Sequence, residues 1–243
     1  MTRSNKKLLG VAVAAFVFFL AVNIPAQVIQ PLLAGTPANM SGLSGTLWNG
    51  AAQNFSVDQL RFGAARWRWK PGGLLTGRME FDFHAGVPGQ QLSGRFGLSV
   101  NGQIHARNAN LELSLTQLGA MPFGTQASIS VAIESLAMAG DWPEHAAGRI
   151  HLNDTSMNIP GKLALGDFEG HFRIANGGNL IADFFDLDGA LEIDGTLDLD
   201  ASGNYQVTGQ IRPRGRINQR LKNILNFMPR ENGVYQLSFS GSL

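Results

Sequence analysis

The chain of 243 residues contains no cysteine, which excludes disulfides, thiol catalysis, cysteine-ligated zinc and iron–sulfur clusters. Charged residues are scarce, at 15% against an average of about 25% for soluble domains. The net charge is only +1, so no global field would attract nucleic acid, and we expect no nucleic-acid partner. Hydrophobic residues nevertheless make up 44% of the chain, which is enough to bury a core without staples.

Motifs that carry chemistry are also missing. The five histidines have no metal-ligand spacing such as H-E-x-x-H, and the sequence has neither a P-loop nor a G-x-S-x-G nucleophile elbow. We therefore expect a protein that is not an enzyme, with no catalytic residue, no metal and no cofactor.

Charge is absent from one long stretch near the N-terminus. Arg3, Lys6 and Lys7 come first, and the next charged residue is Asp58. Between them, Leu8 to Ala26 spans 19 largely apolar residues, close to the roughly 20 that cross a bilayer as a helix. Cations on one side only favour a cytoplasmic N-terminus. We predict a cytoplasmic tail over residues 1–7 and a transmembrane anchor over residues 8–26, with its apolar surface made by Leu8, Val11, Phe16, Phe18, Phe19 and Leu20.

A cleaved signal peptide is the alternative to a retained anchor. The basic start and the apolar run of Leu8–Val22 fit both. The cleavage site fits less well, because Ile24-Pro25-Ala26 places a β-branched residue where a small one is preferred. Either interpretation exports the chain, so we predict a single-pass inner-membrane protein whose residues 27–243 form a periplasmic domain.

The remaining sequence alternates with a period of two. Runs such as Arg78–Phe83, Asn110–Leu115 and Val234–Phe239 place apolar residues on one side and polar residues on the other, and turn residues separate them. Glycine, at 30 residues, marks turns and sheet bends. The predicted fold class is mainly β: a glycine-rich antiparallel domain, a curved sheet or sandwich, with a soft boundary between two halves near residues 140–148.

One segment near the C-terminus has helical periodicity instead. From Arg216 to Met228, apolar residues share one helical face, and Pro229 ends the run. We predict an amphipathic helix docked on the sheet. Acid and base are segregated beside it: Asp183–Asp200 carries only acidic charges, which fit a solvated strand face better than a calcium loop. The basic residues after it either pair with that acidic run or bind an acidic partner, and the candidates are Arg212, Arg214, Arg216 and Arg220.

Basic and aromatic residues alternate in Arg66–Lys70. Two interpretations stay open for this short strand. Trp67 and Trp69 are core residues beneath a solvated basic face, or they lie at headgroup level with the cations directed toward anionic lipid.

Three short elements follow the apolar stretch in a fixed order: a GTLWxGxA element, a W-x-W-x-P element and an LLxG element. This order resembles the N component of bacterial type II secretion systems, and the resemblance extends to the length, the single apolar N-terminal stretch and the C-terminal Gly233–Leu243. It rests on Gly45, Leu47, Trp48, Gly50, Trp67, Trp69, Pro71, Leu74, Leu75 and Gly77.

The resemblance implies an accessory inner-membrane component of a Gram-negative secretion machine, with other secretion components and inner-membrane lipid as partners. It also implies a fold similar to that of AsmA-like lipid-handling proteins, which have long curved sheets with an apolar inner face. A lipid-binding or lipid-transfer module with a β groove is therefore the second hypothesis. A contiguous apolar concavity favours the lipid module, and a fully packed inner face favours a scaffold.

Overall fold

The computed structural model describes residues 3–118, 124–158, 161–215, 217 and 219–242. Helical segments are few and short apart from the first, and strands make up most of the chain. The helical segments are α1 (Arg3–Val22), η1 (Ala26–Val28), α2 (Ile29–Leu33), η2 (Pro71–Thr76), η3 (Leu115–Leu118) and α3 (Gln219–Leu225). The strands are β1 (Ala38–Ser41), β2 (Ser44–Gly45), β3 (Asn49–Val57), β4 (Leu60–Lys70), β5 (Arg78–Val87), β6 (Gln90–Ser99), β7 (Ile104–Ser114), β8 (Gln126–Met138), β9 (Pro143–Asn158), β10 (Lys162–Ile174), β11 (Leu180–Asp186), β12 (Leu191–Leu199), β13 (Asn204–Pro213), β14 (Arg230–Glu231) and β15 (Val234–Ser242).

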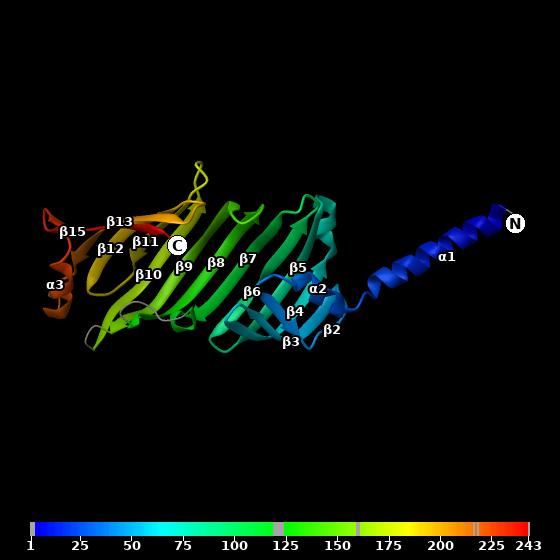
Figure 1. Ribbon diagram of the computed structural model, residues 1–243, viewed down its shortest axis with the longest axis horizontal. Coiled ribbons are helices and arrows are strands. Elements are labelled where there is room, and N and C mark those ends of the chain that lie inside the picture. Colours follow the sequence, from blue (N-terminus) through cyan, green and yellow to red (C-terminus); the bar gives the residue numbers. More distant parts are fainter. Residues whose placement is uncertain (1–2, 119–123, 159–160, 216, 218, 243) are drawn as a thin grey trace.

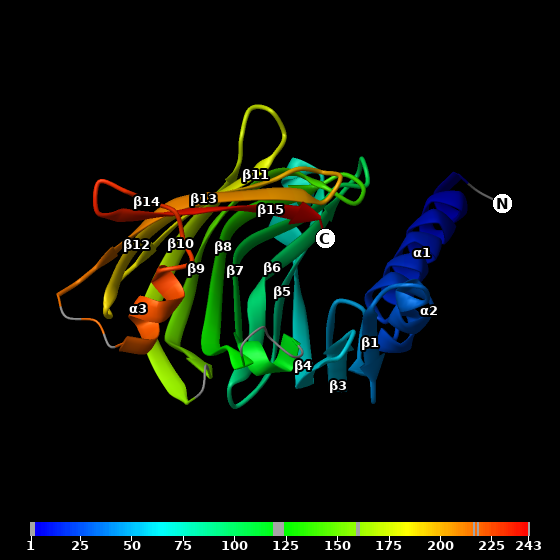
Figure 2. The ribbon, with the colours of Figure 1, turned by 60° about the vertical axis from the view of Figure 1, so that its left-hand side comes forward.

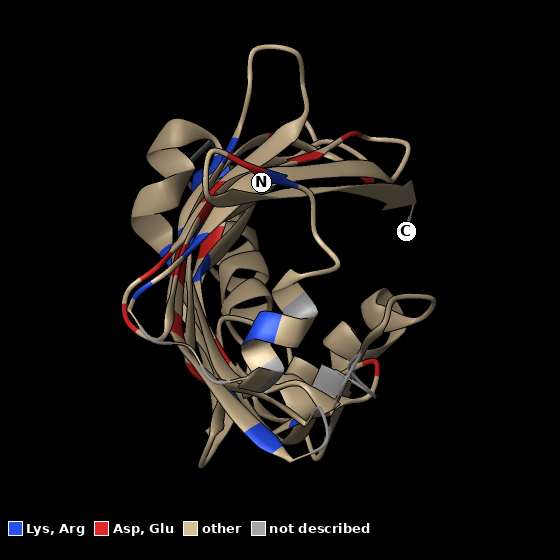
Figure 3. Ribbon diagram, turned by 90° about the vertical axis from the view of Figure 1, so that its left-hand side faces the viewer, with Lys and Arg blue, Asp and Glu red and all other residues tan. Residues whose placement is uncertain are grey.

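These strands form one sheet in which nearly every strand pairs with its neighbour in sequence. The order is β1-β3-β4-β5-β6-β7-β8-β9-β10-β11-β12-β13-β15-β14, all pairings are antiparallel, and β2 pairs separately with β3. The sheet twists and curls into a long open arch, which has a C-shaped cross-section (Figures 1, 2 and 3). The predicted antiparallel β fold is confirmed. The stretch 140–148, expected as a soft boundary, forms the turn between β8 and β9 and the first residues of β9.

Helix α1 projects away from one end of the sheet (Figure 1). Its apolar side chains face outward: Val11 is 68% exposed, Phe16 62%, Phe18 70%, Phe19 62% and Leu20 52%. Among the described residues, no helix combines the length and apolarity needed to cross a bilayer. The transmembrane anchor therefore stays a prediction.

Two apolar clusters lie on the sheet, one toward each end. The N-terminal cluster includes the buried residues Ala26, Phe55 and Trp67, with Ile29 of α2 packed against it. The C-terminal cluster joins Leu221 and Leu225 of α3 to residues of β10, β12, β13 and β15. Figure 2 shows α3 on the concave side of the arch. The docked amphipathic helix is confirmed, although α3 covers only Gln219–Leu225 of the expected Arg216–Met228.

Candidate functional site: an apolar trough and the tryptophan cluster at its N-terminal end

The two faces of the sheet differ in polarity along its whole length. Strand registers align apolar residues from strand to strand into rows, one of which runs Ile133, Gly148, Phe172, Ala182, Leu197, Val207 and Phe239. The row one residue away in sequence is polar on most strands and runs Ala132, Arg149, His171, Asp183, Thr196, Thr208 and Ser238. Because α3 and α2 pack on the apolar face, this face is the concave one, and we call it the trough.

Most of the trough is neither fully packed nor fully exposed. Along its middle, Val131, Ile150 and Phe172 are each partly buried by their neighbours within the sheet. The described helical segments η1 and α2 pack against its N-terminal part, and α3 packs against its C-terminal part. The registers therefore place apolar rows on the concave face, and the lipid hypothesis expects such a face.

The trough deepens into a cavity at its N-terminal end. The cavity has a volume of about 560 Å³, and its lining is entirely apolar. Phe55, Phe83 and Phe96 lie on one wall, where the ring centroids of Phe55 and Phe83 are 5.1 Å apart and those of Phe83 and Phe96 are 6.0 Å apart. Ile29 and Leu33 of α2 contribute to the lining from outside the sheet. A site with this lining can hold an alkyl chain but offers no polar group to fix the orientation of a polar ligand.

The first two motif elements form a tryptophan cluster, Trp48, Trp67 and Trp69, that ties the end of α1 to the sheet. The indole N–H of Trp48 donates to the carbonyl of Ala21 at 2.7 Å, and that of Trp67 donates to the carbonyl of Leu47 at 3.0 Å. The rings of Trp48 and Trp69 lie 4.8 Å apart between centroids. These contacts fix the direction in which the chain leaves α1.

The glycines of the same elements are explained by close approach and by backbone conformation. A Cβ at Gly50 would lie 2.3 Å from Cζ2 of Trp67, so only glycine fits beneath that ring. Gly45 has φ +82°, in the left-handed region that favours glycine. The two glycines of the GTLWxGxA element are thus required by the backbone conformation and the close packing around the tryptophan cluster.

The LLxG element lies in the β4–β5 connection. Pro71 begins η2, and Gly77 ends it with φ 68°. Leu74 is 54% exposed and Leu75 is 93% exposed, so neither belongs to the core. The amide of Val100, itself 93% exposed in the β6–β7 turn, donates to the carbonyl of Gly77 at 3.1 Å. The two turns together present an apolar tip.

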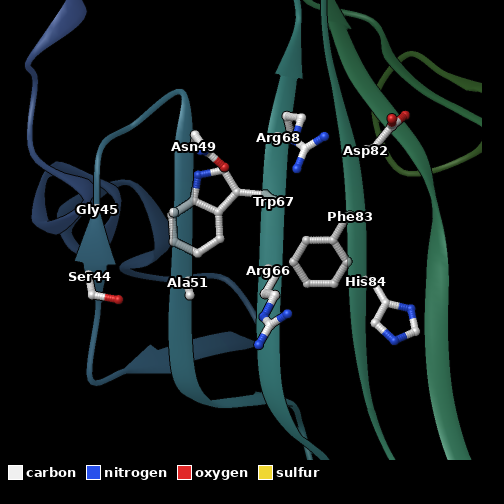
Figure 4. A pocket seen from close by; sticks show the side chains of 11 residues that line it. Ser44, Gly45, Asn49, Ala51, Arg66, Trp67, Arg68, Asp82, Phe83 and His84 are labelled. Carbon is white, nitrogen blue, oxygen red and sulfur yellow. The ribbon is translucent and has the colours of Figure 1, made fainter.

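In the alternating strand Arg66–Lys70, the aromatic and basic side chains lie on opposite faces of the sheet, as the pattern predicts. Trp67 is 6% exposed, whereas Arg66 and Arg68 are exposed on the other face. A hollow of about 460 Å³ lies here over β2 to β5, and both arginines contribute to its lining (Figure 4). Trp67 is therefore a packing residue, and the arginines remain available to an anionic group.

The predicted partner-binding arginines are only partly placed. Arg212 lies 3.5 Å from Glu192 and 3.6 Å from Asp194, and Arg214 lies 2.6 Å from Asp186. Of the two alternatives, pairing with the acidic run is the one seen for both residues. Arg216 and the side chain of Arg220 lie outside the described residues.

Ion pairs on the convex face lower the pKa values of several carboxyl groups. Hydrogen bonds from Arg173 and Thr196 lower the pKa of Asp183, with Arg173 contributing most. The hydrogen bond from His171 lowers the pKa of Glu169, against a smaller effect of burial that raises it. Within the part of the chain that is described, no group of three or more His, Asp or Glu side chains is arranged to hold a metal ion.

The trough was not among the sites named from the sequence. Period-two alternation showed that each strand has an apolar side, but neighbouring apolar sides form one surface only when the registers agree. The registers, with bulges such as those between Ala52, Phe55 and Ser56, are not readable from the sequence alone.

Comparison with known proteins gives consistent matches. The family described as type II secretion system (T2SS), protein N matches residues 37–238. Type II secretion system protein N of Aeromonas hydrophila is 27% identical over 169 residues, which cover 64% of this chain and 65% of that protein. The protein of the same name from Vibrio cholerae serotype O1 is 26% identical over 160 residues, which cover 60% of this chain and 62% of that protein. The matched stretch thus spans just under two thirds of each relative. No solved structure matches the chain.

Proposed function

The chain belongs to the type II secretion system protein N family, and from this premise we propose that it is an accessory inner-membrane component of that machinery. In this role the β domain lies in the periplasm and binds other components, which supports the export of folded proteins across the outer membrane. The family match over residues 37–238 carries this proposal, because it covers nearly all of the sheet.

The outward-facing apolar side chains of α1 support the proposed membrane attachment. Phe16, Phe18 and Phe19 are each more than 60% exposed, which is unfavourable in water and favourable in lipid. Trp48, whose indole donates to Ala21 at the end of α1, supplies an aromatic residue of the kind that favours a membrane–water interface. The apolar tip of Leu74, Leu75 and Val100 is a second candidate for contact with the bilayer surface.

The absence of cysteine makes the topology directly testable. Single-cysteine variants Asn5→Cys and Asn101→Cys place one thiol before and one thiol after the predicted anchor, residues 8–26. With a membrane-impermeant maleimide added to the periplasmic side, we expect labelling of the second variant only, and retention of the protein after alkaline carbonate extraction. Labelling of both variants in intact spheroplasts would show that α1 lies on the membrane and does not cross it.

The trough favours a second candidate function, which is lipid binding or transfer. The supporting observation is the cavity of about 560 Å³, with its wholly apolar lining, at the end of the sheet from which α1 projects. An alkyl chain could reach this cavity from the bilayer, and the aligned apolar rows would extend its path toward β15.

Substitutions at two adjacent residues of β8 test whether the trough is needed for function. Val131 lies in the trough, and Ala132 lies on the convex face opposite Arg149. In the host, deletion of the gene should reduce exoprotein release, and wild-type protein should restore it. If the trough carries lipid, Val131→Asp should fail to complement while the matched control Ala132→Asp succeeds. Normal secretion in the deletion strain, accompanied by altered outer-membrane lipid composition, would refute the secretion role and support lipid transfer.

A further inference from the structure

The C-terminal edge of the sheet is open along most of its last strand. The short strand β14 pairs with β15 only at Tyr235 and Val234. Beyond Gln236, the segment Ser238–Ser242 has β13 on one side and no described strand on the other. We call this segment the β15 edge.

The direction of the unpaired backbone groups follows from one hydrogen bond. The amide of Gln236 donates outward, to the carbonyl of Pro229 at 2.8 Å. Hydrogen-bonding groups of alternate residues in an antiparallel strand point to opposite sides. The N–H and C=O groups of Ser238, Ser240 and Ser242 therefore also point outward, away from β13.

The opposite edge of the sheet is protected, and the contrast is informative. There β1 has only four residues, and α2 lies against it. Natural sheets protect edges with short strands, charges, prolines, bulges or covering elements. The β15 edge lacks these protections: Ser238–Ser242 has no charge and no proline, its register with β13 is unbroken, and no described strand pairs with its outer side.

We propose that the β15 edge binds an extended segment of another secretion component, which adds as a further strand to the sheet. This proposal deepens the proposed function and rests on it. Only an extended backbone offers donors and acceptors at the repeat of a strand, which is what the three serine residues require. The segment should be uncharged and alternating, with apolar side chains beside Leu237 and Phe239 on the trough face and polar ones beside the serines. Phe239, which is 50% exposed, would be covered by such a strand.

A second copy of the chain fits this edge less well. Antiparallel pairing of two β15 edges would relate the copies by a twofold axis. Helix α1 and the C-terminal strands lie at opposite ends of the longest axis of the molecule (Figure 1). The two α1 helices would then lie at the two far ends of the pair, which a single flat bilayer cannot accommodate. A different chain has no such constraint.

Hydrogen exchange on the full chain in nanodiscs tests the proposal. Purified periplasmic domains of the other secretion components of the same host are added one at a time as probes. With one of them, we expect roughly tenfold slower exchange at the amides of Ser238, Ser240 and Ser242, with no change at Asn39 in β1. Ser240→Pro removes one outward N–H and should weaken that binding by about tenfold, whereas the matched control Ser240→Thr keeps the N–H and should bind normally.

The outcomes distinguish this proposal from the function on which it rests. Slowing by no component, while deletion of the gene still abolishes secretion, would overturn the edge proposal alone. Slowing that grows with the concentration of the protein itself would identify a second copy as the occupant and would also overturn it. If Ser240→Pro does not fold, Phe239→Lys replaces it as a variant that places a charge at the edge.

Discussion

The two ends of the sheet are held in different ways. At the N-terminal end, Ala26 is fully buried, Trp67 is nearly so, and indole hydrogen bonds join the end of α1 to the strands. At the C-terminal end, the seven-residue helix α3 provides the cover, and the strand edge beyond it is open. The N-terminal end therefore holds the end of α1 through hydrogen bonds and packing. At the C-terminal end, no described strand pairs with the outer side of Ser238–Ser242.

If the N-terminal end depends on the tryptophan cluster, truncation there should cost most. We expect Trp67→Ala to lower the free energy of unfolding by about 3–5 kcal/mol, because it removes a buried indole and leaves a void above Gly50. Chemical denaturation of the purified domain measures this. Trp142→Ala, in the β8–β9 turn, is the matched control and should cost far less, because its indole makes only a surface hydrogen bond to Gly178. A stable Trp67→Ala protein that no longer supports secretion would identify a contact surface and refute the packing account.

Truncation under α3 should have a smaller effect, because one short helix makes that contact. Leu225 is 2% exposed and packs against the C-terminal cluster. Leu225→Ala should cost about 2–3 kcal/mol, near the lower end of the range for buried leucine, since the helix can settle toward the sheet. The exposed neighbour Asn223→Ala is the control. A loss as large as that of Trp67→Ala would show that the two ends are equally dependent on their covers.

The sequence predicted the fold well where alternation was regular. β5 and β15 contain the expected runs, and β7 contains all of Asn110–Leu115 except Leu115, because one side of each strand faces the trough and the other faces water. Five strands were missed: the short strands β1, β2 and β14, and the longer strands β3 and β11. In β11, the consecutive residues Phe184 and Phe185 interrupt the alternation of apolar and polar residues. In β3, a register shift near Phe55 interrupts the same alternation. Helix α3 was expected to be longer because apolar spacing continues beyond the hydrogen-bonded turns.

The candidate site was predictable only in part. The motif residues were found because glycine and tryptophan at fixed spacing have few structural roles, and the structure shows Gly50 beneath Trp67. The resemblance implied a curved sheet with an apolar inner face, but the residues that line the trough could not be predicted, because they depend on the registers of more than ten strand pairs. Local sequence specifies the apolar side of each strand, but the shared surface comes from pairing over the whole sheet.

The hydrogen bonds of Asp186 test whether polar contacts, in addition to α3, stabilise the C-terminal end of the sheet. The carboxylate of Asp186 in β11 accepts from the amide of Ile193 at 2.7 Å and from Arg214 at 2.6 Å, and its side chain is 2% exposed. Asp186→Ala leaves the partly buried amide of Ile193 without its partner and should cost about 1–2 kcal/mol by chemical denaturation. Asp141→Ala, in an exposed turn, is the control. No effect at Asp186 would mean that α3 alone holds this end.

The smallest effect is expected midway between the ends, on the convex face, as a dependence on pH. Glu169 lies between two histidines: His171 Nε2 is 2.6 Å from Glu169 Oε1, and His151 Nδ1 is 3.7 Å from Glu169 Oε2. The His171 hydrogen bond lowers the pKa of Glu169 below its ordinary value. A carboxyl group whose folded pKa is lowered stabilises the fold fully above its unfolded pKa, near 4.3, and this contribution disappears as the pH falls through the folded pKa. Chemical denaturation of the wild-type protein at a series of pH values from about 6 downward should therefore show a free energy of unfolding that falls as the pH falls. In Glu169→Gln this fall should be smaller by a fraction of 1 kcal/mol, because the ion pair is partly solvated. An identical acid slope in the variant would show that this ion pair contributes nothing to the middle of the sheet, and that the difference between the two ends arises from their covers alone.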